Sequence, residues 1–148
     1  ADAAHRYFKR VTRKIAIPLE LDIQTEPVSM VGDMVQLKFL LENLINEALT
    51  YNLAGRLELH MFKEGNFVRV NFIDRRQEYT QEELNQLFYP HLSRMKHQGE
   101  GVLTGTEYLV CKQIIREHDE FAGRRGCRIN ACPASGGGFM VWFTIPAR

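Results

Sequence analysis

Two polar residues four positions apart, Asn43 and Glu47, lie beside the apolar side of one strongly patterned segment. That segment, residues 33–52, reads DMVQLKFLLENLINEALTYN. Residues four apart on a helix stack one turn above the other, so this amide and this carboxylate can reach one ligand or one metal ion. Polar residues beside a helix face are more often simply solvated. The pair nevertheless predicts a polar ligand site, because oxygen donors of these two kinds suit a divalent cation.

An amphipathic helix positions this pair. Its apolar residues recur at the spacing of a single buried helical face: Leu37, Leu40, Leu41, Leu44 and Ala48. Asp33 precedes the helix and is predicted to cap its first turn through the side-chain carboxylate. A second register, Glu42 with Asn46, has the same spacing of four. We prefer Asn43 with Glu47, because the second register turns the apolar stripe out of phase with the core.

The composition is that of one soluble globular domain. The chain has 148 residues, of which 45% are hydrophobic and 25% charged, with a net charge of +1. This length fits a single domain with a proper core. No apolar run is long enough for a membrane span, and no signal-peptide pattern opens the chain. The small net charge and a short basic patch without a stacking platform argue against nucleic acid as a partner.

Alternating helical and period-two patterns predict an α+β domain, a two-layer α/β sandwich with a mixed sheet and helices on one face. Residues 1–14 are expected to form a basic helical connector, and residues 15–148 the folded domain. The turn Glu64-Gly65-Asn66 predicts a β-hairpin between two alternating strands. Thr80 followed by Glu83 predicts a capping box. The expected elements are strands at 15–25, 56–63, 67–74, 124–132 and 138–145, and helices at 33–52, 80–88 and 106–118.

The cysteines and histidines offer weaker alternatives. Cys127 and Cys132 with His118 can be drawn as a zinc site, but the five-residue offset and the missing fourth ligand disfavour it. The odd number of cysteines, which includes Cys111, favours reduced and buried thiols. A phosphoacceptor role for His5 is disfavoured, because no acidic neighbour or long hairpin helix accompanies it.

Six segments in order resemble one known family, the catalytic and ATP-binding domain of sensor histidine kinases. This family is part of the wider GHKL group that includes the gyrase, Hsp90 and MutL ATPases. The resemblance covers about residues 15–146 and implies the Bergerat-type fold of histidine kinases and Hsp90. The matching stretches are VGD before the helix, LLENLINEALTY for the asparagine box, FID for the adenine-site strand, LF with Arg94 for the phenylalanine box, CKQIIREH for the second long helix, and GFMVWFTIP for the last strand.

The resemblance also implies residue roles. Asp74 corresponds to the aspartate that receives the amino group of adenine. Asn43 and Glu47 correspond to the two asparagines near phosphate and magnesium, so the implied cofactors are ATP and magnesium. Gly105 corresponds to a glycine of the second glycine box, and Lys96 to a basic residue of the lid, which spans residues 89–104. The implied setting is a cytoplasmic two-component signalling protein, whose other domains, and a response regulator, are the expected partners.

Departures from the family fall on the nucleotide site. Glu47 replaces the asparagine that holds magnesium, and its added negative charge repels a triphosphate unless a cation lies between them. Arg76 and Glu78 stand where the first glycine box has glycines, and such side chains add bulk near adenine. In the second box Glu107 and Tyr108 also depart from the family pattern. Two hypotheses therefore stand: a histidine kinase ATP-binding domain with weak or no ATP binding, and a pseudokinase module that acts only through protein contacts.

Overall fold

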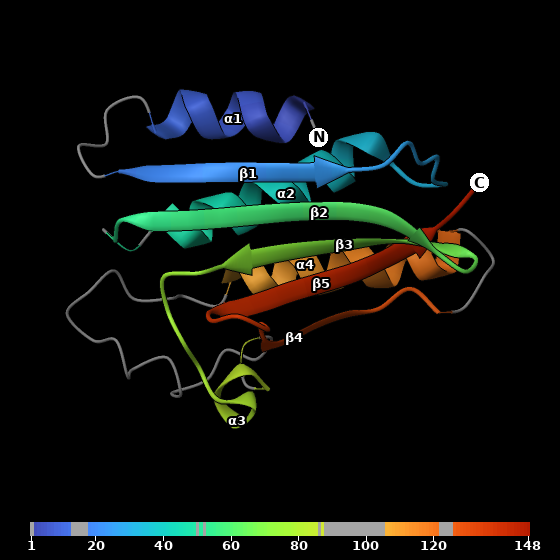
Figure 1. Cartoon of the computed structure of the whole chain (residues 1–148). Coiled ribbons are helices and arrows are strands. Elements are labelled where there is room, and N and C mark those ends of the chain that lie inside the picture. The colour runs from blue at the N-terminus through green and yellow to red at the C-terminus, as the bar shows by residue number, and fades with distance from the viewer. Residues whose placement is uncertain are drawn as a thin grey trace.

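The computed structural model has one mixed five-stranded sheet with the order β1-β2-β3-β5-β4. It describes residues 2–12, 18–49, 51, 53–85, 87, 106–121 and 126–148. Helices α2 and α4 cover one face of the sheet, and α1 runs along the edge strand β1 (Figure 1). The elements are α1 (Asp2–Thr12), β1 (Leu19–Thr25), α2 (Met34–Leu49), β2 (Gly55–Glu64), β3 (Phe67–Asp74), α3 (Gln81–Leu84), α4 (Thr106–Phe121), β4 (Ile129–Pro133) and β5 (Phe139–Pro146).

The predicted α+β two-layer fold is confirmed. Strand β1 pairs in parallel with β2, and the other neighbouring strands pair antiparallel. The hairpin of β2 and β3 turns at Gly65-Asn66, where Gly65 adopts a φ of 62° that favours glycine. Within the described ranges, no helix is long and apolar enough to cross a membrane.

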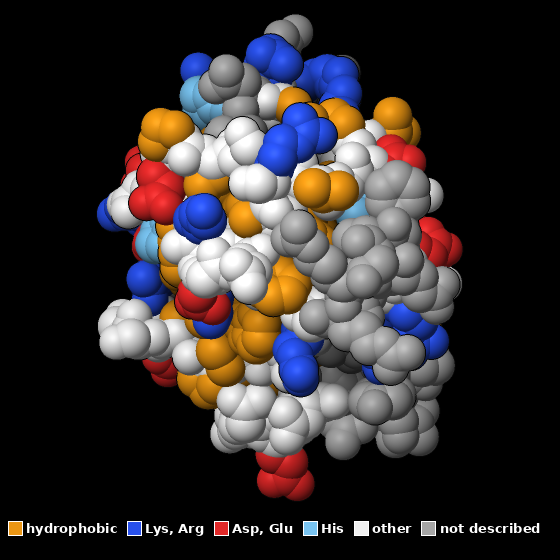
Figure 2. All heavy atoms as spheres, turned by 90° about the vertical axis from the view of Figure 1, so that its right-hand side faces the viewer, with side chains coloured by type: hydrophobic (Ala, Val, Ile, Leu, Met, Phe, Trp, Pro, Cys, Tyr) orange, Lys and Arg blue, Asp and Glu red, His pale blue; other side chains and the backbone are white. Residues whose placement is uncertain are grey.

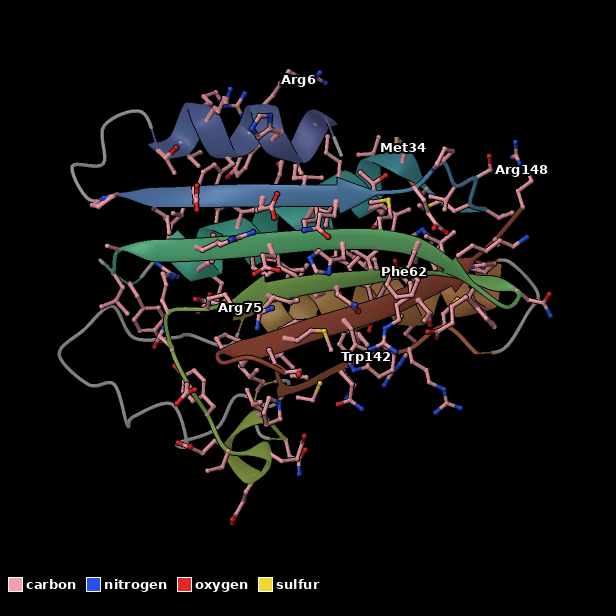
Figure 3. All side chains as sticks on the ribbon, in the orientation of Figure 1. Arg6, Met34, Phe62, Arg75, Trp142 and Arg148 are labelled. Carbon is pink, nitrogen blue, oxygen red and sulfur yellow. The ribbon has the colours of Figure 1, made fainter. Side chains whose placement is uncertain are left out.

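Alternation along the strands gives the sheet two chemically different faces. The face toward the helices is apolar, and its buried side chains are Leu57, Leu59, Val68, Val70, Phe72, Val141, Phe143 and Ile145. The opposite face is mostly polar, and Glu58, Asn71 and Trp142 lie on it by register. Figure 3 shows Phe62, Arg75 and Trp142 on this open side. Asp74 is an exception, because it pairs with Leu57 and so faces the helices.

Helix α2 forms as the sequence predicts, with Asp33 as its N-cap. The Asp33 carboxylate accepts hydrogen bonds from the backbone N–H groups of Val35 at 2.9 Å and Gln36 at 3.1 Å. The helix ends at Leu49, three residues before the predicted end. The apolar stripe is buried at Leu37, Leu40, Leu44, Ile45 and Ala48, whereas Leu41 is only half-buried.

His118 of α4 fixes the start of α2 and is engaged in contacts unrelated to zinc. Its Nε2 accepts a hydrogen bond from the Asp33 N–H at 2.9 Å. Its Nδ1 lies 2.8 Å from the Ile114 carbonyl oxygen, to which it donates when the ring is neutral. Among the residues that the structure describes, no group of three or more His, Cys, Asp or Glu side chains could hold a metal ion. Cys111 is buried as predicted, whereas Cys127 and Cys132 are half-buried.

Candidate functional site

The candidate site centres on Asp74, the last residue of β3. Its carboxylate is 2% exposed and lies on the helix face of the sheet, between the partners Leu57 on β2 and Phe139 on β5. Burying an ionised carboxylate is costly unless hydrogen bonds or an opposite charge compensate it. The contacts of Asp74 therefore decide what this site can bind.

Arg76 supplies that compensation from within the chain. Its Nε donates to Oδ1 of Asp74 at 2.9 Å, and its Nη2 donates to Oδ2 at 2.8 Å. The backbone N–H of Arg76 also donates to Oδ1 at 2.9 Å. The side chain of Arg76 is 1% exposed, so the pair is fully buried. This is the bidentate fork that arginine forms with carboxylates, the strong geometry for such a pair.

The remaining donors of Arg76 reach backbone carbonyls at and just after the end of α2. Nη2 donates to the Ala48 carbonyl at 2.6 Å, and Nη1 to the Leu53 carbonyl at 3.0 Å. Nη1 also donates to the Tyr51 carbonyl at 3.4 Å. A guanidinium has five N–H donors, and all five have acceptors here. Arg76 thus joins the end of β3 to the end of α2.

Gly55 leaves room for the stem of Arg76. A Cβ atom at position 55 would lie 2.6 Å from Cγ of Arg76, closer than side-chain carbons approach each other. Gly55 also has a φ of 143°, which side chains rarely adopt. A glycine is therefore needed as the first residue of β2, because the buried stem of Arg76 fills the space beside it.

The neighbouring Arg75 turns to the opposite face of the sheet (Figure 3). Its Nε donates to Glu58 at 2.7 Å, and its Nη1 donates to the carbonyls of Ser135 and Gly137, each at 2.7 Å. The hydrogen bond from Arg75 holds the pKa of the Glu58 carboxyl below its usual value. The two adjacent arginines thus have separate partners, one set buried near the helices and one on the open face.

Aromatic rings adjoin the buried pair. Tyr79 packs edge-on against Phe139, with 5.1 Å between ring centroids, and donates to the side chain of Gln77 at 2.8 Å. Burial raises the pKa of the Tyr79 hydroxyl well above its usual range, and the nearby Tyr51 and Asp74 add to this rise.

The helix pair Asn43 and Glu47 lies on the inner side of α2. Glu47 is 3% exposed, whereas Asn46 is exposed and accepts a hydrogen bond from the Tyr7 hydroxyl at 2.6 Å. The preferred register thus contains the buried Glu47, and the alternative register contains the exposed Asn46. Nδ2 of Asn43 is buried and has no hydrogen-bond partner among the residues that the structure describes.

Two predicted site residues, Gly105 and Lys96, lie outside the described residues. The predicted lid at residues 89–104 lies outside them as well. The same holds for the side chain of Tyr108. Arg76 links the Asp74 carboxylate to the carbonyl of Ala48, the residue that follows Glu47 on α2.

Sequence reasoning identified Arg76 only as added bulk and missed Gly55 entirely. The sequence signal for the role of Arg76 is its position two residues after an aspartate that ends a buried strand. Its backbone N–H then bonds the aspartate, which brings the guanidinium back to the same carboxylate. No local signal marks Gly55, because it meets Arg76 only once the sheet has formed.

Solved structures of histidine kinases share this fold. A mycobacterial sensor histidine kinase, MprB, superposes with a TM-score of 0.74 at 18% identity, covering 99% of this chain and 93% of that one. The histidine kinase ThkA in complex with the response regulator protein TrrA gives 0.71 at 18% identity, covering 99% and 39%. Full-length ShkA in complex with AMPPNP gives 0.72 at 15% identity, covering 99% and 29%.

Sequence comparison supplies the family. A search of curated proteins found no match. The family model described as histidine kinase-, DNA gyrase B- and HSP90-like ATPase matches residues 32–148, most of the chain, including α2, Asp74 and Arg76. The chain therefore belongs to the histidine kinase-, DNA gyrase B- and HSP90-like ATPase family.

Proposed function

We propose that this domain serves a sensor histidine kinase-like signalling protein as a module that binds ATP weakly or not at all. It acts through contacts with other domains or proteins, as a pseudokinase does. The setting we propose is a cytoplasmic two-component pathway, with other domains of the parent protein and a response regulator as partners. The complex of the similar kinase ThkA with TrrA supports this choice of partner.

The observation that carries the proposal is the buried guanidinium of Arg76 on the Asp74 carboxylate, whose oxygens accept three hydrogen bonds, all from Arg76. In the family this aspartate receives the adenine amino group, which needs a free acceptor oxygen. Here both oxygens already accept from Arg76, whose side chain is 1% exposed. Adenine would have to displace a buried guanidinium and leave its donors to find new partners, and separating such a pair costs about 3–5 kcal/mol. The residues present therefore do not fit adenine at this position.

One observation favours the second candidate, a domain that still binds magnesium and ATP. The Nδ2 group of Asn43 is buried without a hydrogen-bond partner among the described residues, and a phosphate oxygen would satisfy it. In that case Asn43 and Glu47 would hold phosphate and magnesium, and Gly105 and Lys96 would contact phosphate. The cost at Asp74 outweighs this single hydrogen bond, whose net worth is about 1 kcal/mol.

Exposed apolar side chains support the part of the proposal that concerns protein contacts. Met34 is 75% exposed, Val35 78% and Phe39 50%, all in the first two turns of α2. Figure 2 faces the end of the molecule where α2 begins, and hydrophobic side chains reach its surface between charged ones. Val35 and Phe39 also line a groove against Val110 of α4. Exposed apolar patches of this kind mark sites of association.

Calorimetric titration with ATP and magnesium tests the proposal. We expect the wild-type domain to bind no more tightly than millimolar, because Arg76 keeps the Asp74 carboxylate occupied. The Asp74→Asn variant should give the same result. Micromolar binding by the wild type that Asp74→Asn abolishes would instead establish an active nucleotide site. The Arg75→Ala variant is the matched control, because Arg75 lies on the other face of the sheet and should not change either outcome.

A further inference from the structure

We propose that the pocket around Asp74 is a guanidinium-binding site that the chain fills with its own Arg76. The inference rests on the proposed function and goes further, because it assigns the chemical class that this pocket selects. The pocket recognises a planar cation with several N–H donors, and it does so in place of adenine. Arg76 is then a built-in ligand rather than an obstacle.

Among the described residues, the groups that bond the guanidinium are carboxylate and backbone carbonyl oxygens. Asp74 contributes two carboxylate oxygens, and Ala48, Tyr51 and Leu53 contribute backbone carbonyl oxygens. A guanidinium matches them, because it has five donors and no acceptor. Adenine presents an amino donor beside an accepting ring nitrogen, so its ring nitrogen would face a carboxylate or carbonyl oxygen. Donor count and charge therefore both favour a guanidinium.

The shape of the pocket fits the arginine stem as well as its head group. The absence of a side chain at Gly55 leaves the space that Cγ of Arg76 fills, and a Cβ there would clash at 2.6 Å. The side chain is 1% exposed, so it is enclosed along its length. Head group and stem thus both have matched surroundings, contributed by α2, β2 and β3.

Filling the pocket has a structural consequence. Arg76 links Asp74 at the end of β3 to Ala48 at the end of α2 and to Leu53 just before β2. These segments converge at the same end of the molecule, where β3 ends and β2 begins (Figure 1). The internal arginine therefore connects these three segments without any bound ligand.

Chemical rescue of Arg76→Ala tests the inference. This variant empties the pocket and should melt well below the wild type. Ethylguanidinium at millimolar concentration should then raise its Tm by several degrees, while an equal concentration of tetramethylammonium should not. Neither the wild type nor Arg75→Ala should respond to ethylguanidinium. ATP with magnesium should raise the Tm of Arg76→Ala less than ethylguanidinium does.

Two outcomes overturn the assignment: no specific rescue of Arg76→Ala by ethylguanidinium, or a larger effect of ATP than of ethylguanidinium. If Arg76→Ala does not fold, Arg76→Lys replaces it, because lysine keeps the charge but offers only three donors. Arg76→Lys should then lose more thermal stability than Arg75→Lys, and equal losses would overturn the assignment. Tight ATP binding by the wild type would refute the proposed function, whereas failed rescue would refute only this site.

Discussion

Replacing Asp74 by asparagine should destabilise the domain far more than its small change in shape suggests. The amide keeps one acceptor oxygen, but its NH2 group must face either Nε or Nη2 of Arg76, donor against donor. The guanidinium then stays buried without a counter-charge, since its side chain is 1% exposed. Breaking a buried ion pair by removing one partner costs about 3–5 kcal/mol. We expect the lower end, about 3 kcal/mol, because the carbonyls of Ala48 and Leu53 still accept from Arg76.

Urea unfolding followed by fluorescence can measure this loss. The chain has one tryptophan, Trp142 on β5, and its register places it on the open face of the sheet, away from Asp74. A loss of about 3 kcal/mol is a large part of the roughly 5–15 kcal/mol that stabilises a typical domain. It should lower Tm by roughly 10 °C in a chain of this size.

The control is Glu58→Gln, which breaks the pair with Arg75, whose side chain is 26% exposed. Such pairs are worth about 0–1 kcal/mol, so this variant should change stability much less. The double variant Asp74→Leu with Arg76→Met should recover much of the loss, because it removes both buried charges. A stability of Asp74→Asn within about 1 kcal/mol of the wild type would refute the conclusion that Asp74 and Arg76 form a buried ion pair.

Three further predictions concern residues around the pair. Gly55→Ala should cost more stability in the wild type than in an Arg76→Ala background. Only the wild type contains the Arg76 Cγ atom that would lie 2.6 Å from the new Cβ, while the strain from the φ of 143° is common to both. Equal costs in a double-mutant cycle would contradict this prediction. Because Arg75 lowers the pKa of Glu58 in the folded state, this carboxylate stabilises the fold at neutral pH, and the contribution is lost as pH falls through the lowered pKa. Melts should therefore show a difference between wild type and Glu58→Gln that is constant above the usual glutamate pKa of 4.5 and shrinks as pH falls below it. A difference that stays constant in acid would count against the ion pair. Thr80→Ala removes the capping-box hydroxyl at the start of α3 and should cost about 1 kcal/mol in urea unfolding, with Thr80→Ser as the control that keeps the cap.

The sequence predicts much of the fold because the patterns that specify it are local. The apolar spacing of α2, the alternation along β2 and β3, and the turn at Gly65 each act within a few residues. Strand order is not local in this way. The neighbours β3 and β5 are separated by a long stretch of chain, so periodicity could not show that they pair.

The candidate site was predictable only in part, for a related reason. Asp74 and the pair Asn43 and Glu47 are predicted from their positions in an ordered set of motifs. The role of Arg76 depends on partners from other segments, since it contacts carbonyls after α2 and fits against Gly55 of β2. The sequence alone shows that position 76 has a bulky arginine where the family has a glycine. It could not show that the arginine pairs with the aspartate beside it.

Arg76 should remain on Asp74 when nucleotide is present. The most direct measurement is the side-chain Nε–H signal of Arg76 in a ¹H–¹⁵N NMR spectrum, assigned by its absence in Arg76→Lys. We predict a signal that exchanges slowly with solvent and does not shift or broaden when magnesium and ATP are added in excess. A signal that exchanges fast in the free domain, or that moves on addition of ATP, would show that Arg76 does not stay on Asp74.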